Sequence, residues 1–129
     1  MELNEYQKKA METCMDTCDN FSYMMLNLVG EVGELAGKMA KKMRKGQIKF
    51  LPSGAYHYNG YAYPEEVNVP ETISAEHKEL KMEAGDILWQ LSGLCKIMGW
   101  TLEEVAQGNL DKLASRKQRG VIDGNGDNR

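Results

Sequence analysis

The sequence has none of the features that place a protein in a membrane or among disulfide-stabilised secreted domains. Its apolar runs, such as residues 21–29, are interrupted by Ser22 and Asn27 and fall far short of the roughly 20 residues that span a bilayer. The first residues, Met-Glu-Leu-Asn-Glu, lack the basic and apolar regions of a secretory signal. The 3 cysteines are odd in number and lack zinc-ribbon spacing, which disfavours both disulfides and a thiolate metal site. A cytoplasmic protein without membrane contact is therefore expected.

The chain is also short of net charge. Its 16 Lys and Arg nearly balance 19 Asp and Glu, and the net charge of -3 offers no general attraction for a polyanion, so nucleic acid is not an expected partner. The 129 residues suit one domain with one hydrophobic core. We expect this domain to cover residues 1–122, followed by a flexible, glycine-rich and polar tail over residues 123–129.

Apolar residues recur at the three- and four-residue steps that are typical of amphipathic helices. One such repeat runs through Met25, Leu28 and Val32 towards the stop signal Gly46, and a later one ends at Gly99. Capping patterns mark three helix starts, namely Asn4 with Gln7, Ser74, and Thr101 with Glu104. The sequence therefore predicts an all-α bundle of four helices, over about 4–19, 22–45, 74–98 and 101–118.

A long connection, residues 46–73, separates the second and third helices and contains all 3 prolines. Within it, alternating tyrosines flank Asn59-Gly60, which is a strong signal for a β-hairpin turn. An isolated hairpin is only marginally stable in water, so we expect its tyrosines to pack against the bundle, a partner subunit or a ligand. Packing in an oligomer is favoured over a lid that stacks on a bound base and over a free flap.

Two pairs of carboxylates lie on the two long predicted helices. Glu31 and Glu34 are three residues apart on one helix, and Glu83 and Asp86 are three residues apart on the other, so each pair shares a helix face. Both pairs border the apolar seam, so packing the two helices together would bring four acids close to one another. Of the four, only Glu34 has a basic residue three or four positions away, which is Lys38. Local ion pairs therefore explain one acid of the four.

Four clustered carboxylates need a cation or protons between them. Two carboxylates ~6 Å apart repel by about 3 kcal/mol at an effective dielectric constant of about 20. Oxygen ligands without Cys or His select a hard ion, Mg²⁺ first and Mn²⁺ as a substitute. Gly33 and Gly85 lie between the acids of each pair, and each costs about 1 kcal/mol in a helix interior, which indicates that another group approaches there. The alternative is that all four acids lie on solvated helix faces.

The fourth predicted helix carries a candidate phosphate clamp. Asn109, Lys112 and Arg116 fall at positions i, i+3 and i+7, so they share one face. Arginine binds phosphate oxygens through two parallel hydrogen bonds, and lysine supplies a compact charge. The alternative is a solvated basic stripe, because cations are favoured near helix C-termini. Beside a metal-binding acidic cluster, the pattern favours contact with phosphates.

Three short motifs follow one another along the chain. They are Glu-Val-Gly-Glu-Leu at 31–35, Glu-Ala-Gly-Asp-Ile-Leu-Trp at 83–89 and Asn-Leu-Asp-Lys-Leu-Ala-Ser-Arg at 109–116. Each motif alone is weak, but their order and spacing resemble the all-helical MazG-like nucleotide pyrophosphohydrolases, a group that also resembles the helical dUTPases and phosphoribosyl-ATP pyrophosphohydrolases. The resemblance spans most of the chain and implies a MazG-like four-helix bundle.

The resemblance also implies an activity, which is magnesium-dependent hydrolysis of a (deoxy)nucleoside triphosphate to the monophosphate and pyrophosphate. The family commonly has a further glutamate directly before the first acidic pair, where this chain has Gly30, so the number of bound ions stays open. The hairpin looks like an insertion, which leaves base and sugar preference open. The resemblance implies that two sets of residues act, the catalytic metal ligands Glu31, Glu34, Glu83 and Asp86, and the phosphate contacts Asn109, Lys112 and Arg116.

Other assignments remain open at this point. Trp89 adjoins the seam of the third helix and is either a core residue or, like Tyr6, a substrate-binding residue beside the base. The long apolar seams predict a homodimer or homotetramer. A competing hypothesis is a non-catalytic helical interaction module whose seams bind a partner. A di-iron carboxylate bundle is disfavoured, because neither His57 nor His77 has a glutamate three residues before it.

Overall fold

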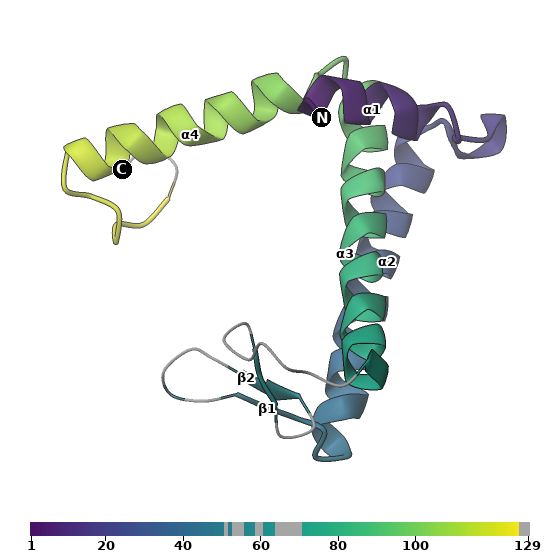
Figure 1. Ribbon diagram of the computed structural model, residues 1–129. Helices are drawn as coiled ribbons and strands as arrows, with labels where there is room; N and C mark the ends of the chain where they lie inside the picture. Colours follow the sequence, from purple (N-terminus) through teal and green to yellow (C-terminus); the bar gives the residue numbers. More distant parts are fainter. Residues whose placement is uncertain (51, 53–55, 59–60, 64–70, 127–129) are drawn as a thin grey trace.

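The computed structural model describes residues 1–50, 52, 56–58, 61–63 and 71–126, and it is all-helical apart from one small sheet, as predicted (Figure 1). None of the helices within these residues has both the length and the apolarity needed to cross a bilayer. In chain order, the elements are α1 (Leu3–Met11), the short 3-10 helix η1 (Asp16–Cys18), α2 (Phe21–Arg44), β1 (Ile48–Phe50), β2 (Tyr56–Tyr58), β3 (Tyr61–Tyr63), α3 (Glu71–Ile97) and α4 (Leu102–Gln118).

The two long helices α2 and α3 lie antiparallel against each other and form the centre of the molecule (Figure 1). Near the sheet, Leu35 and Met39 of α2 pack against the buried pair Ile48 and Leu80. At the opposite end, Met24 of α2 is fully buried where it meets α3. This pairing fixes which faces of the two helices meet and therefore which acidic residues come together.

The close approach between α2 and α3 occurs at Gly93, not at the glycines that the sequence indicated. A β-carbon at position 93 would overlap the thioether of Met24. At Gly33 and Gly85, in contrast, a β-carbon would meet no heavy atom within 4 Å. The expectation of a close neighbour at Gly33 and Gly85 is therefore wrong within one chain, because both glycines lie on faces that the α2–α3 packing leaves open.

The predicted helix ends are largely confirmed. Gly46, Gly99 and Gly120 follow α2, α3 and α4 with φ of 70°, 73° and 69°, the left-handed conformation that glycine adopts without strain. The Thr101 side chain caps α4 by accepting a hydrogen bond from the backbone N–H of Glu104. The helix α3 begins at Glu71, so residue 74 lies inside α3 instead of capping it.

The first helix is shorter than predicted and its capping pattern was misassigned. It ends at Met11 instead of near residue 19, because the Trp89 indole N–H reaches the carbonyl of Ala10 at 3.0 Å, and the Thr13 hydroxyl donates to the same carbonyl at 2.7 Å. Asn4 and Gln7 do not form a capping box in α1. They instead accept hydrogen bonds from the backbone N–H groups of Glu103 and Leu102, the first residues of α4.

A three-stranded antiparallel sheet, in the order β1-β2-β3, lies at the end of the α2–α3 pair opposite α1 (Figure 1). The predicted hairpin is confirmed, with Tyr58 opposite Tyr61. The strand β1 was not predicted, although it supplies the buried Ile48. The expected packing of the hairpin tyrosines concerns side chains outside the described part of the structure.

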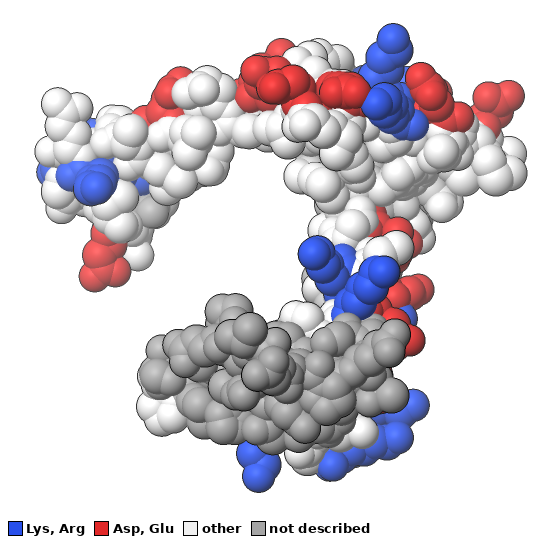
Figure 2. All heavy atoms as spheres, viewed as in Figure 1, with Lys and Arg blue, Asp and Glu red and all other residues white. Residues whose placement is uncertain are grey.

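The helix α4 leaves the α2–α3 pair at the end where α1 crosses it and runs outward as an arm (Figure 1). Its first residue, Leu102, is buried, but farther along the helix Leu110 and Leu113 are 59% and 41% exposed. In Figure 2, residues other than Lys, Arg, Asp and Glu cover much of the side of this arm that faces the sheet end of the molecule. The chain then turns back beneath the arm, where the Arg116 guanidinium donates to the carbonyl of Gly126. The arm therefore carries an apolar surface that nothing in the described part of one chain covers.

Candidate metal and nucleotide site

Three of the four predicted carboxylates come together midway along the α2–α3 pair. Glu31 extends from α2 and Glu83 and Asp86 from α3, and one oxygen of each lies within 4.8 Å of the others. Glu83 is buried, Glu31 is half-buried, and Asp86 is exposed. The amide of Asn27, one turn before Glu31, donates to Glu31 at 3.0 Å and fixes its orientation. The i, i+3 spacing on each helix and the seam packing together produce this cluster.

The carboxylates of the cluster repel one another, and the effect is visible at Glu31. Burial raises the pKa of Glu31, and repulsion from Glu34 and Asp86 raises it further, while the hydrogen bond from Asn27 partly opposes this rise. Glu34, the fourth predicted acid, is exposed and lies outside the group of three, yet its charge still acts on Glu31. A proton or a cation bound among these carboxylates would relieve the repulsion.

Lys38 meets the cluster from a direction that the sequence did not indicate. Its ammonium group pairs with Glu83 across the helix interface, not with Glu34 on its own helix. The Glu83 side chain is 12% exposed and the Lys38 side chain 47% exposed, so the pair lies at the edge of the groove between α2 and α3. The predicted local pairing of Lys38 is therefore wrong, and Glu83 has a basic partner from the other helix.

The donor set of the cluster fits a hard divalent cation. Within the described residues, Glu31, Glu83 and Asp86 are the group of side chains arranged to hold a metal ion, and all of their donor atoms are carboxylate oxygens. Three oxygens within 4.8 Å of one another can face a common ion after small rotations of the side chains.

The predicted phosphate-binding residues of α4 lie elsewhere. Because α4 projects away from the α2–α3 pair, a single chain does not bring them to the carboxylates (Figure 1). Arg116 is 5% exposed and is occupied near Gly126, and Asn109 lines an apolar groove with Leu88 at the corner where α1, α3 and α4 meet. The structure therefore separates the predicted basic set, which also includes Lys112, from the acidic set.

An aromatic pocket adjoins the acidic cluster on its Asp86 side. This pocket, of about 590 Å³, is lined by Tyr6 of α1 and by Trp89, Gly85, Asp86 and several basic residues of α3. Trp89 is half-buried, and its indole N–H donates to the Ala10 carbonyl and to the Thr13 hydroxyl. Burial and the neighbouring Asp86 raise the pKa of Tyr6. Trp89 thus anchors α1 on α3 and also lines an open pocket, while its contact with a substrate base stays a prediction.

A second groove was not anticipated from the sequence. It is formed on α2 below the acidic cluster by four lysines, Lys38, Lys41, Lys42 and Lys45. Their spacing of three and four residues on one helix face could have indicated the groove, but of these lysines only Lys38 was considered in the sequence, as a local partner of Glu34. The groove has a volume of about 310 Å³, and Glu76 and Glu79 of α3 form its other wall.

Comparison with known proteins places the chain in a family. Residues 19–121 match the MazG nucleotide pyrophosphohydrolase domain. The chain is also similar to the Gene 37 protein of Mycobacterium phage L5, with 33% identity over 137 residues and all of both chains covered. No solved structure matches the chain. Because the domain match covers most of the chain, including both acidic pairs, the protein belongs to the family of MazG nucleotide pyrophosphohydrolase domains.

Proposed function

We propose that this protein hydrolyses a nucleoside or deoxynucleoside triphosphate to the monophosphate and pyrophosphate in a magnesium-dependent reaction. The observation that carries the proposal is the group of carboxylate oxygens from Glu31, Glu83 and Asp86 within 4.8 Å of one another. The family supports a hydrolase that acts on nucleotides. A nucleotide substrate and reduced cysteines both fit a cytoplasmic protein.

In this proposal, Glu31, Glu83 and Asp86 hold magnesium, and Glu34 joins them from the same face of α2. Manganese prefers the same oxygen ligands and is expected to substitute. A bound ion of this kind would stabilise the negative charge on a phosphate oxygen and lower the pKa of a coordinated water. The carboxylates of the chain would hold the ion, and one of them would be placed to accept the proton of the water that attacks phosphorus.

The nucleotide base is proposed to lie in the aromatic pocket beside Asp86. Tyr6 and Trp89 supply flat surfaces for the base, and the pocket opens towards the carboxylates through Asp86, which lines it. The hydrogen bonds of Trp89 to α1 hold the indole in place before the substrate arrives. This placement would bring the base to one side of the metal ligands and leave the phosphates at the ligands themselves.

The proposal includes a second copy of the chain. The arm α4 exposes Leu110 and Leu113, and α2 exposes Leu26 and Val29 at 76% and 68%, so each element has an apolar surface that a homodimer would cover. The arm also carries Lys112 and other basic residues towards its end, opposite in charge to the carboxylates. We propose that α4 of one copy delivers Asn109 and Lys112 to the acidic cluster of the other, within a homodimer or a homotetramer built from such dimers. In this proposal Arg116 joins them by leaving its contact with Gly126.

The test is to incubate the protein with each common NTP and dNTP in the presence of magnesium and to resolve the products. Monophosphate and pyrophosphate are expected for at least one nucleotide. Diphosphate and orthophosphate would show that the attacked phosphorus is wrong, and no product with any nucleotide would contradict the enzyme proposal.

The competing function, a helical interaction module, makes a different prediction for stability. An enzyme that binds magnesium and nucleotide gains about 2.7 kcal/mol of folding free energy at a ligand concentration 100 times the dissociation constant. An interaction module gains nothing from these ligands. Thermal unfolding with magnesium, with magnesium and nucleotide, and with neither separates the two functions.

A further inference from the structure

The lysine groove on α2 has the charge of a polyanion site. Four cationic side chains face two acidic ones, Glu76 and Glu79, so the groove has a formal excess of two positive charges. Lys42 lies 3.8 Å from Glu76, and Lys38 pairs with Glu83. Lys41 and Lys45 make no ion pair with any residue among those that the structure describes. Lys41 and Lys45 are both exposed, so an incoming anion can reach them without breaking an ion pair.

The groove is continuous with the acidic cluster. On α2, Glu34 and Lys38 are four residues apart, which corresponds to about 6 Å along the helix axis. On α3, Glu79 of the groove wall lies one turn from Glu83 of the cluster. The same side of the α2–α3 pair therefore changes from acidic to basic along its length, and Glu83 belongs to both parts through its pair with Lys38. Figure 2 shows acidic and basic side chains next to each other along this pair of helices.

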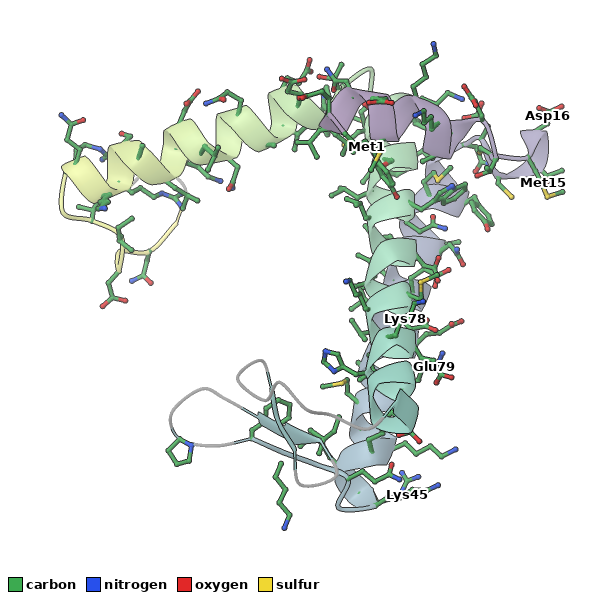
Figure 3. All side chains as sticks on the ribbon, viewed as in Figure 1. Met1, Met15, Asp16, Lys45, Lys78 and Glu79 are labelled. Atoms are coloured by element: carbon green, nitrogen blue, oxygen red, sulfur yellow. The ribbon has the colours of Figure 1, made fainter. Side chains whose placement is uncertain are left out.

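Two of the residues labelled in Figure 3, Glu79 and Lys45, line the groove. Glu79 lies on the flank of α3 and Lys45 near the end of α2. Both residues line the groove together with Gln47, which follows α2 and adds an amide to the wall. A polyphosphate chain that extends from a cation at the carboxylates towards the end of α2 would meet ammonium groups one helical turn away. It would meet further ammonium groups at the next turn.

We propose that this lysine groove, formed by Lys38, Lys41, Lys42 and Lys45, binds the polyphosphate chain of the nucleotide, and that Lys38 exchanges Glu83 for a phosphate oxygen when the carboxylate takes a cation. The inference rests on the proposed function. Lys38 then has two roles. Without a cation it neutralises the buried Glu83, and with one it is repelled towards the groove, where it lies between the cluster and the remaining lysines.

The lysine groove and the basic residues of α4 differ in which chain supplies them to the carboxylates. The groove lysines belong to the same chain as the carboxylates, so they act without a second copy, whereas the basic residues of α4 need one. Binding to the groove is therefore expected to persist in a variant that cannot assemble. A polyphosphate is also the part of the substrate that all nucleoside triphosphates share, so the groove would contribute affinity without base selectivity.

The probe for the test is inorganic tripolyphosphate in saturating magnesium, titrated into the full-length protein by calorimetry. The double variant Lys41→Met/Lys45→Met removes two charges without touching Glu83 and is expected to weaken binding about tenfold. The matched control is Lys8→Met/Lys9→Met, which removes two exposed charges from α1, and its affinity is expected to stay within about twofold of the parent. Lys41→Arg/Lys45→Arg keeps the charge and should keep the affinity. Equal weakening by the methionine variant and by its control would overturn the groove.

The exchange by Lys38 has its own readout, which is the binding of Mn²⁺ alone followed by electron paramagnetic resonance. Because Lys38 competes for Glu83, Lys38→Met is expected to bind Mn²⁺ at least as tightly as the parent while binding tripolyphosphate more weakly. Weaker Mn²⁺ binding by this variant would contradict the exchange. If Lys41→Met/Lys45→Met leaves nucleotide hydrolysis unchanged, the proposed role of the groove is contradicted and the proposed activity stands. If tripolyphosphate binding depends on these lysines but no nucleotide is hydrolysed, the proposed activity is contradicted and the binding site stands.

Discussion

The α2–α3 pair and the α4 arm carry the two halves of the predicted site, and one chain brings together residues of the first half only. Glu31, Glu83 and Asp86 converge because α2 and α3 bury their seams against each other. The residues of α4 share a helix face as predicted, but the arm projects away from the acids (Figure 1). Spacing along a helix thus determines which side chains share a face, while packing determines what that face meets.

The difference has a physical origin in how each helix is held. α2 is packed along much of its length, from Met24 at one end to Met39 near the sheet. α4 is held mainly at its start, where Leu102 is buried and its N–H donates to Gln7. Beyond that first turn, exposed Leu110 leaves the position of the arm dependent on whatever covers it.

The largest expected effect is on the acidic half. Glu83→Gln and Asp86→Asn each remove one anionic ligand while keeping the shape of the side chain, so turnover should fall by a factor on the order of 100 or more. The stabilisation by magnesium in thermal unfolding should disappear in parallel. Steady-state kinetics and melting curves at several magnesium concentrations check both effects.

The control for these acid variants is Glu103→Gln, an exposed acid in the first turn of α4 that lies away from the cluster. Its turnover should match that of the parent, apart from a small loss of helix stability. Full turnover in the Glu83→Gln/Asp86→Asn double variant would show that the acidic cluster is not the metal site.

The second prediction concerns assembly through the arm. Leu110→Asp/Leu113→Asp places two charges on the apolar surface of α4, so a homodimer that buries this surface should dissociate, and turnover should fall by about tenfold or more. Light scattering after size exclusion gives the mass of the species. Gln118→Asp, a new charge at the end of the same helix, is the control and should leave the assembly intact.

Mixing inactive variants tests whether the second copy supplies the basic residues. Glu83→Gln keeps an intact α4, and Lys112→Ala keeps intact carboxylates, so mixed dimers contain one site with both sets. Part of the activity should return on mixing. If the mixture stays as inactive as its components while Lys112→Ala alone has lost activity, the basic residues act within one chain and the arm must move.

A third prediction concerns Gln7 of α1, which connects the end of α3 to the start of α4. The Gln7 amide donates to the carbonyls of Ser92 and Trp100 at 3.3 and 3.1 Å and accepts from the N–H of Leu102 at 3.0 Å. Gln7→Ala removes two buried hydrogen bonds and one part-buried one from these backbone groups, and the free energy of unfolding should fall by about 2 to 3 kcal/mol. Urea denaturation measures this loss, and the adjacent exposed Lys8→Ala should change the free energy of unfolding by less than ~0.5 kcal/mol.

Much of the fold follows from local chemistry that is visible in the sequence. Periodic apolar residues give the two long helices, Gly46 and Gly99 end them, and Thr101 caps α4, because each depends on neighbours within a few residues. The hairpin follows for the same reason, from alternating tyrosines around Asn59-Gly60.

The interactions that were not predicted from the sequence involve partners that are distant along the chain. Gln7 has the spacing of a capping residue in α1, but it bonds to residues more than eighty positions away. Lys38 has Glu34 within reach on its own helix, yet it pairs with Glu83, because the buried carboxylate gains more from a cation than an exposed one does. The direction of α4 follows from no local pattern, because this helix is held mainly at its start, through Leu102.

The smallest predicted effect is on stability, at the glycines that lie between the acids of each pair. A β-carbon at residue 33 or 85 meets no heavy atom within 4 Å, so Gly33→Ala and Gly85→Ala should each raise the free energy of unfolding by about 0.5 to 1 kcal/mol through helix propensity. Gly93→Ala is the contrasting control, because its new methyl group meets Met24 and should destabilise the fold by about 1 to 3 kcal/mol. Urea denaturation of the three variants gives the values.

The activity of the same variants then shows what approaches the open face. Gly85 lines the aromatic pocket, so a methyl group there should raise KM for the nucleotide even though the protein becomes more stable. Gly33 lies on α2 between Glu31 and Glu34 and does not line that pocket, so an effect of Gly33→Ala on assembly would indicate that a second copy packs there. If both variants gain stability and keep unchanged kinetics and mass, neither the base nor a partner helix touches these positions, and the arm must reach the acids by another route.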